Sequence, residues 1–201
     1  DCGIVDHTGA FAAVNLAGPK SREVLKTLTS LDLSAAAFPY LAVREGEVTV
    51  GGGKIPARLM RVGFVGERGY EIHVPASMGG ALWDALMQAG KAHGIRPFGV
   101  EAQRLLRLEK GHIIISQDTD GLTTPLEVGM DWAVKMAKPF FVGQRSLAAI
   151  ARKPRKQQLA GIVFPVGYSG AVPLECNLVI EGGDIAGRAT SIAVSRRRDR
   201  H

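Results

Sequence analysis

Two runs of alternating apolar and polar residues, joined by a short glycine-flanked segment, place the strongest constraint on how this chain can fold. Residues 55–65 and 70–74 alternate with period two, and residues 66–69 (GERG) connect them. This pattern is typical of strands that turn one face to a core, and the glycine-containing connection favours an antiparallel hairpin. In the second run, alternation separates Glu71 and His73 from the apolar side chains. The region therefore predicts an antiparallel sheet with one polar face.

Segments with helical spacing of apolar residues alternate with short strand-like runs along the chain. Residues 21–31, 77–94 and 99–110 carry apolar side chains three and four positions apart, as amphipathic helices do. Residues 11–16 and 39–43 are apolar runs near glycine or proline, as expected of buried strands. With 46% hydrophobic and 22% charged residues, the chain can form a packed core. We therefore expect an α+β fold with helices and a mainly antiparallel sheet.

The composition changes after about residue 148, which indicates a second domain. Residues 151–157 are largely basic and polar, as in an interdomain linker. Short apolar runs between glycine and proline turns follow at residues 159–164, 178–180 and 185–189. Such runs are typical of a small β-barrel or sandwich, but too few residues remain for a self-sufficient barrel. We therefore expect a first domain over residues 1–150, a linker over 151–157, and a truncated C-terminal β-barrel over 158–201.

The charge distribution and the cysteine content exclude several classes of protein. The net charge is +6, and most of the excess lies in residues 152–156 and 196–200. Neither run has interleaved aromatic residues to stack on bases, so we expect solvated charges and no nucleic-acid partner. No run of roughly 18 apolar residues predicts a membrane span. Cys2 and Cys176 form neither a disulfide scaffold nor a metal cluster, which favours a reducing, cytoplasmic location and no metal site.

Five motifs in a fixed order carry a resemblance to a known family. They are NLAGP at residues 15–19, FVGERGYEI at 64–72, LLRLEKG at 105–111, DTDGLTTPLE at 118–127 and GRATS at 187–191. Together they resemble the glycine cleavage T-protein (aminomethyltransferase) family in order and spacing. Within this family, GVEAQR at residues 99–104 and EKGH at 109–112 are most similar to the C-terminal, folate-binding half of the sarcosine oxidase α subunit.

The resemblance implies a function in one-carbon metabolism. Members of this family bind tetrahydrofolate and transfer a one-carbon (aminomethyl) unit from an amine-derived donor, which gives 5,10-methylenetetrahydrofolate. The aspartate that steers the amine in this family belongs to a segment upstream of the matching motifs, so no catalytic residue is assigned here. The chain also starts without methionine. We therefore expect part of a longer protein that is inactive alone and that associates with itself or with partner subunits.

The resemblance also implies which residues bind the pterin ring of folate. Glu71 matches the carboxylate that accepts paired hydrogen bonds from the pterin N–H groups, an arrangement strengthened by charge. Glu67 and Tyr70 belong to the same motif. Phe64 stands where the family commonly has tyrosine, so it can stack on the pterin but lacks the hydroxyl. Gln103 stands where T-proteins carry an arginine, so it can form hydrogen bonds but adds no positive charge.

Several polar residues downstream allow a functional and a structural interpretation. Asp118 and Asp120 could line the mouth of the folate site, or they could cap turns, which we favour. On the predicted helix over residues 99–110, Arg107 and Glu109 are expected to form ion pairs along that helix. From the residues alone, the favoured interpretation of Glu71 is an ordinary solvent-facing glutamate.

Two alternatives from other functional classes remain open. One is the folate-binding, iron–sulfur-assembly branch of this fold, which is marked by K-G-C-Y-x-G-Q-E. The corresponding stretch is KPFFVGQR at residues 138–145, in which Phe140 replaces the cysteine. The other alternative is a non-catalytic remnant that folds without binding folate. Binding of a reduced folate by the purified chain would separate these possibilities.

Overall fold

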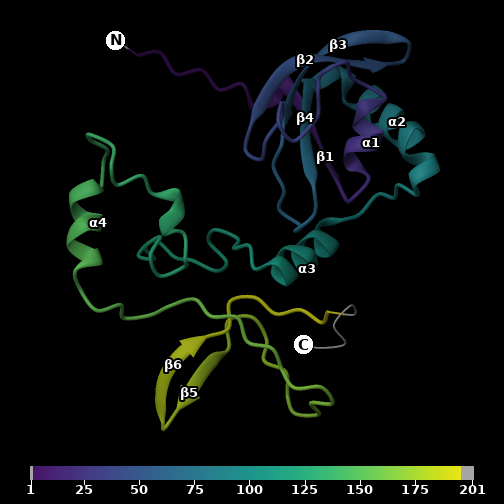
Figure 1. The fold of residues 1–201 in the computed structure, drawn as a ribbon. Helices are drawn as coiled ribbons and strands as arrows, with labels where there is room; N and C mark the ends of the chain where they lie inside the picture. The colour runs from purple at the N-terminus through teal and green to yellow at the C-terminus, as the bar shows by residue number, and fades with distance from the viewer. Residues whose placement is uncertain (1, 196–201) are drawn as a thin grey trace. The chain divides into compact units, whose positions relative to one another are not determined.

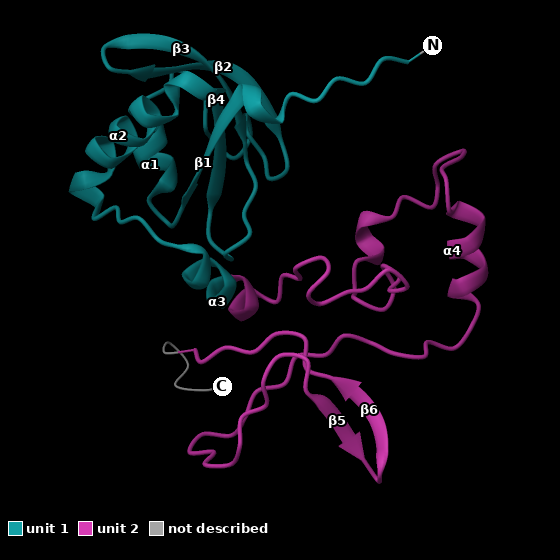
Figure 2. Cartoon of the chain, turned by 180° about the vertical axis from the view of Figure 1, so that it is seen from behind, with its two compact units in different colours: residues 1–106 teal, residues 107–201 magenta. Residues whose placement is uncertain are grey.

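A computed structural model describes residues 2–195. The chain divides into two compact units, unit 1 over residues 1–106 and unit 2 over residues 107–201 (Figure 2). The basic run at residues 196–200 lies outside the described residues. The compact units divide the chain earlier than the sequence-based domain boundary at residues 151–157, which stays a prediction.

Unit 1 is built on a four-stranded antiparallel sheet with strand order β1-β4-β3-β2 (Figure 1). The strands are β1 (Phe11–Ala17), β2 (Val43–Val50), β3 (Gly53–Met60) and β4 (Gly69–Pro75). Two helices, α1 (Ser21–Lys26) and α2 (Gly79–Gly90), lie within unit 1. A third helix, α3 (Val100–Lys110), crosses the division between the units after residue 106. Short 3-10 helices lie at Thr8–Ala10, Ala76–Met78 and Lys91–His93. The predicted combination of helices with a mainly antiparallel sheet is confirmed.

The helices α1 and α2 cover one face of this sheet, and the core lies between the two layers (Figure 1). Along β4 the side chains of Tyr70, Ile72 and Val74 are fully buried in that core, whereas Glu71 and His73 are only partly buried. Because each buried aliphatic side chain contributes about 1.5–3 kcal/mol, this alternation fixes which face of β4 points inward. The alternation expected for residues 70–74 is confirmed.

The hairpin boundaries in unit 1 differ from those expected. The strand predicted over residues 55–65 ends at Met60, and residues 61–68 form the connection to β4. A further hairpin joins β2 to β3 through Gly51 and Gly52, whose φ angles of +55° and +82° suit a tight two-residue turn. The strand expected over residues 39–43 is a turn until β2 begins, and Leu41 there has a φ of +67°.

Unit 2 has little regular structure of its own. It contains a 3-10 helix at Asp131–Ala133, α4 (Gln144–Ala151), which the sequence did not predict, and a hairpin of β5 (Leu178–Glu181) and β6 (Asp184–Arg188). The expected strand at residues 159–164 was wrong, since these residues form no strand. No described strand forms backbone hydrogen bonds of a β-sheet with residues 159–164. Without a neighbouring strand, an apolar run cannot satisfy its backbone groups as a sheet does. Among residues 2–195, the strands expected at residues 178–180 and 185–189 form the two-stranded β5–β6 hairpin, and the barrel stays a prediction.

No helix within the described part of the chain is long and apolar enough to cross a membrane. Within the same residues, no group of three or more histidine, cysteine or acidic side chains is arranged to hold a metal ion.

Candidate functional site

The sheet face opposite α1 and α2 carries a row of side chains centred on Glu71. In the strand register, Asn15 of β1 and Met60 of β3 lie directly beside Glu71 of β4. Side chains that oppose one another in this way share one face of the sheet and lie close together. Asn15 is exposed, and Met60 and Glu71 are half-buried, so this row is accessible on unit 1. It therefore offers a carboxylate, an amide and a thioether on one surface.

The carboxylate of Glu71 is held on one side by His73. The Nε2 atom of His73 lies 3.4 Å from Oε2 of Glu71, and the two side chains are 26% and 39% exposed. If Nε2 of the imidazole carries the proton, it donates this hydrogen bond to the carboxylate oxygen, which accepts it. No hydrogen bond or ion pair among the described residues engages the other oxygen, Oε1, so it is free to accept a donor from a ligand.

A second row on this face lies next to the first and contains Arg58 of β3 beside His73. Arg58 donates from Nε and Nη2 to one oxygen of Glu45, at 3.1 and 2.8 Å. Its guanidinium carbon also lies 5.7 Å from the centre of the Phe11 ring. The charge of Arg58 is therefore engaged by Glu45, and within residues 2–195 the side-chain contact of the Glu71 carboxylate is the one with His73.

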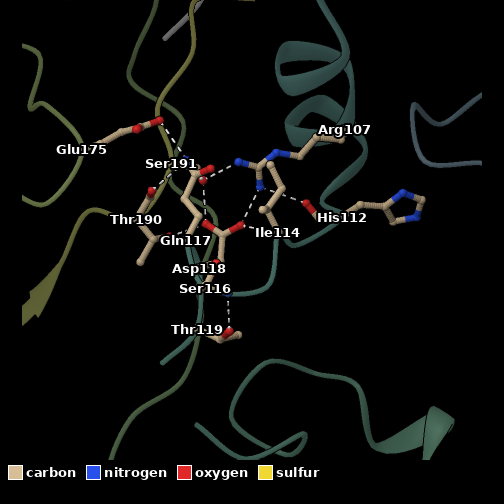
Figure 3. A network of polar contacts seen from close by, with 10 residues as sticks. All are labelled: Arg107, His112, Ile114, Ser116, Gln117, Asp118, Thr119, Glu175, Thr190 and Ser191. Carbon is tan, nitrogen blue, oxygen red and sulfur yellow. Dashed lines mark hydrogen bonds and ion pairs between the residues drawn. The ribbon is translucent and has the colours of Figure 1, made fainter. Parts of the chain in front are cut away.

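A separate network of polar side chains lies within unit 2 and centres on a buried ion pair (Figure 3). The Nη1 atom of Arg107 lies 2.6 Å from Oδ2 of Asp118, and the two side chains are only 2% and 3% exposed. Arg107 also donates to the backbone oxygen of His112 at 3.0 Å and to Oγ of Ser191 at 2.5 Å. Thr190 and Ser191 each donate to Oδ1 of Asp118 at 2.6 Å. The network ties the residues after α3 to the segment that follows β6.

These contacts correct the expected ion pairing on α3 and favour the structural interpretation of the following loop. Arg107 pairs with Asp118, and Glu109 accepts a hydrogen bond from Ser195. Asp120 caps a turn, since its side chain accepts from the backbone N–H groups of Leu122 and Thr123. The local helical spacing suggested a partner three or four residues away, but the buried partner of Arg107 comes from beyond the helix.

Comparison with known proteins decides the family. The GCVT N-terminal domain matches residues 1–138 of the chain. The chain belongs to the GCVT family. This GCVT-family chain is 40% identical over 164 residues to sarcosine oxidase subunit alpha from Rhizobium meliloti (strain 1021), covering 81% of the chain and 16% of that subunit. It is 32% identical over 192 residues to an aminomethyltransferase from Halothermothrix orenii, covering 96% of the chain and 51% of that protein.

A solved structure supports the fold of this GCVT-family chain. The crystal structure of glycine cleavage system aminomethyltransferase T from Bartonella henselae matches it with a TM-score of 0.69 and 24% sequence identity. The match covers 93% of the chain and 49% of that structure. The chain thus spans about half the length of these aminomethyltransferases and a smaller part of the sarcosine oxidase subunit. The resemblance predicted from the five sequence motifs is confirmed.

The residues expected to bind a pterin occupy different surroundings in this GCVT-family structure. Tyr70 lies on the core side of β4, where its ring packs 5.9 Å from that of Phe38. Glu67 is exposed and Phe64 is half-buried, both in the connection between β3 and β4, and Gln103 is half-buried on α3. Among the described residues, no hydrogen bond or ion pair joins Glu67 or Gln103 to Glu71. The structure therefore brings Glu71 together with His73, which the motif comparison had not assigned. Alternation in the sequence had already placed both side chains on the polar face, but it did not indicate the contact between them.

The environment of Asp118 shifts its acidity. Burial raises the pKa of this carboxyl, but hydrogen bonds from the backbone N–H of Ile114 and from Ser191, Thr190 and Arg107 together outweigh burial. The pKa of Asp118 is therefore lower than the ordinary value of 3.8. The carboxylate is ionised at neutral pH, as its ion pair with Arg107 requires.

We expect unit 2 to lose stability in acid through Asp118. Because the pKa of Asp118 is lowered on folding, its contribution is complete above the ordinary value of 3.8 and is lost as the pH falls through the lower folded value. Urea unfolding of the wild type between pH 6 and pH 2.5, followed by hydrogen exchange of unit 2 amides, measures this loss. In Asp118→Asn the free energy of unfolding should be lower at pH 6 but fall less steeply below pH 4. Equal slopes in the two proteins would contradict the assignment.

Proposed function

We propose that this chain provides the pterin-binding face of a tetrahydrofolate-dependent enzyme that transfers a one-carbon (aminomethyl) unit. The observation that carries the proposal is the half-exposed carboxylate of Glu71, one oxygen of which has no partner among the described residues, on the sheet face that α1 and α2 do not cover. The names of its relatives, aminomethyltransferase and sarcosine oxidase subunit alpha, support this class of reaction. The identity of the amine that donates the one-carbon unit would depend on the branch of the family to which the whole protein belongs.

The residues of this face suit a reduced pterin. Its ring offers adjacent N–H donors, and one carboxylate accepts two of them through charge-assisted hydrogen bonds. Glu71 can supply Oε1 and the remaining lone pair of Oε2, since His73 occupies only one side of the carboxylate. Arg58 does not compete for Glu71, because it is engaged by Glu45. When bound, tetrahydrofolate supplies the nitrogen atoms that receive the one-carbon unit as 5,10-methylenetetrahydrofolate.

Other residues of the predicted set would act around this carboxylate. Phe64 would give an apolar surface for the ring, and Gln103 and Glu67 would contribute hydrogen bonds at its edge. Tyr70, which faces the core, would act indirectly by fixing β4 behind the site, where its hydroxyl accepts a hydrogen bond from Nε of Arg22 at 3.3 Å. These groups bind and orient, and orientation of this kind accounts for a large part of catalysis in group transfer.

We further propose that the chain acts as part of a larger assembly. Several relatives are named as a subunit, which supports partner subunits or self-association. We assign no described residue to proton transfer at the amine, so the chain alone is expected to bind folate without turning it over. Residues 1–150 would form the folate-binding domain, 151–157 the linker and 158–201 part of a C-terminal β-barrel that includes the β5–β6 hairpin.

Replacement of Glu71 tests this proposal directly. In Glu71→Gln one acceptor oxygen becomes an NH₂ donor that faces the pterin N–H groups, and the charge is lost. We expect the affinity for tetrahydrofolate to fall by at least about tenfold, in line with the loss of a hydrogen bond to a charged group. Ligand-observed NMR under anaerobic conditions measures the dissociation constant even when binding is weak.

A matched control lies elsewhere on the same sheet. Glu47 on β2 is exposed and pairs with Lys54 at 3.6 Å, so Glu47→Gln makes the same chemical change away from the proposed site. Its affinity should equal that of the wild type. Equal affinity of the wild type and Glu71→Gln would remove Glu71 from the site, and absence of binding by the wild type would favour a non-catalytic remnant.

A further inference from the structure

We propose that His73 is a positioning residue that holds the Glu71 carboxylate in the orientation in which it accepts the pterin N–H groups. This inference rests on the proposed function of Glu71 as the pterin acceptor. His73 does not contact the ligand in this account. It acts through the hydrogen bond from its Nε2 to Oε2 of Glu71, and it leaves Oε1 for the ligand.

A positioning group matters because the side chain of a glutamate can adopt several conformations. Glu71 is 39% exposed and has three rotatable bonds, so without a partner it would sample several orientations. Fixing such a side chain costs conformational entropy. A hydrogen bond formed before the ligand arrives removes part of that cost from binding, which is the general benefit of preorganisation.

The strand register identifies the neighbours of His73 on this face. Along β4 the order is Glu71, His73, Pro75, and the register places Arg58 of β3 beside His73. Phe11 of β1 lies beside Pro75. Because β4 lies between β1 and β3, the contact of 5.7 Å between the Arg58 guanidinium and the Phe11 ring bridges β4. The side chains of Arg58 and Phe11 are therefore neighbours of His73 on this face.

The charged groups of this row also favour a single arrangement. Arg58 donates two hydrogen bonds to Glu45 and lies near the Phe11 ring, and in this structure it does not pair with Glu71. The β1 residue beside His73 is Ala13, which carries no polar group that could compete for the imidazole. Glu71 is thus the polar partner that the described neighbours leave for Nε2 of His73.

A pair of substitutions at His73 separates positioning from simple packing. His73→Leu fills much of the same space without a donor, whereas His73→Gln keeps an N–H donor. We expect His73→Leu to weaken tetrahydrofolate binding by about three- to tenfold, the typical effect of one hydrogen bond, and His73→Gln to stay within about twofold of the wild type. His73→Ala, a second variant without the donor, should behave as His73→Leu if the leucine variant does not fold.

The same substitution in the Glu71→Gln background completes a double-mutant cycle, measured by ligand-observed NMR with tetrahydrofolate as the probe. Since His73 acts through the Glu71 carboxylate, His73→Leu should have no further effect there. Wild-type affinity in His73→Leu, or equally weak binding in His73→Leu and His73→Gln, would overturn the positioning role while Glu71 keeps its own. Absence of binding by the wild type would instead overturn the proposed function, and the role of His73 with it.

Discussion

Arg107→Met should lower the free energy of unfolding of unit 2 by about 3–5 kcal/mol, the usual cost of breaking a buried ion pair by removing one partner. The variant keeps an unbranched side chain of similar length but leaves Asp118 buried without its cation. It also removes the donors to His112 and Ser191, so the segment that follows β6 loses one of its anchors. Hydrogen exchange of unit 2 amides in increasing urea measures the change.

Two further variants show whether the buried charge is the cause. The double variant Arg107→Met/Asp118→Leu removes both charges, so it should recover part of the loss. Arg58→Met breaks an exposed ion pair with Glu45, and exposed pairs contribute about 0–1 kcal/mol. If Arg107→Met and Arg58→Met had equally small effects on their own units, the ion pair would not be a stabilising element of unit 2.

Ile72→Ala should destabilise unit 1 by about 2–5 kcal/mol, because it removes three carbon atoms from a fully buried position and leaves a cavity. Ile72 lies between Glu71 and His73 in sequence but on the opposite face of β4. Its contribution is to packing, and it should leave the hydrogen bond between its two neighbours in place once the unit is folded. Urea unfolding monitored by hydrogen exchange of the β4 amides gives the free energy.

The comparison for Ile72 is a residue on the open face of the same sheet. Asn15 lies beside Glu71 and is exposed, so Asn15→Ala should change the free energy of unfolding by less than about 0.5 kcal/mol. A large effect of Asn15→Ala together with a small effect of Ile72→Ala would mean that the two faces of the sheet have been interchanged.

The sequence predicted the sheet of unit 1 well where local patterns determine structure. Alternation in residues 70–74 correctly separated Glu71 from the core, since period two follows directly from strand geometry. It missed β2 because the outward side chains of that strand, Glu45 and Glu47 among them, leave few apolar residues to detect. It also missed the sharp turn at Leu41. Leucine rarely adopts a positive φ angle, so its presence did not indicate a turn there.

Local sequence patterns could not predict contacts between residues that are distant in the sequence. The partner of Arg107 is eleven residues away, and the donors Thr190 and Ser191 lie 72 and 73 residues from Asp118. Helical spacing suggested pairs within α3, because only neighbours three or four residues apart can be read from the sequence. At the candidate site, the motif resemblance gave Glu71, and the fold added the contact of 3.4 Å with His73.

The proposal that the sheet face with Glu71 binds reduced pterin can be tested by following the NMR signal of a single methionine methyl group. Met60 is placed beside Glu71 by the strand register, whereas Met78 packs against the core on the helix side of the sheet. In protein labelled with ¹³C at the methionine methyl groups, addition of tetrahydrofolate should shift the Met60 signal and leave that of Met78 unchanged. The result we predict is a shift of Met60 that needs at least about tenfold more ligand in Glu71→Gln than in the wild type. An unchanged Met60 signal at saturating ligand, with shifts confined to Met78 or to Met136 of unit 2, would contradict it.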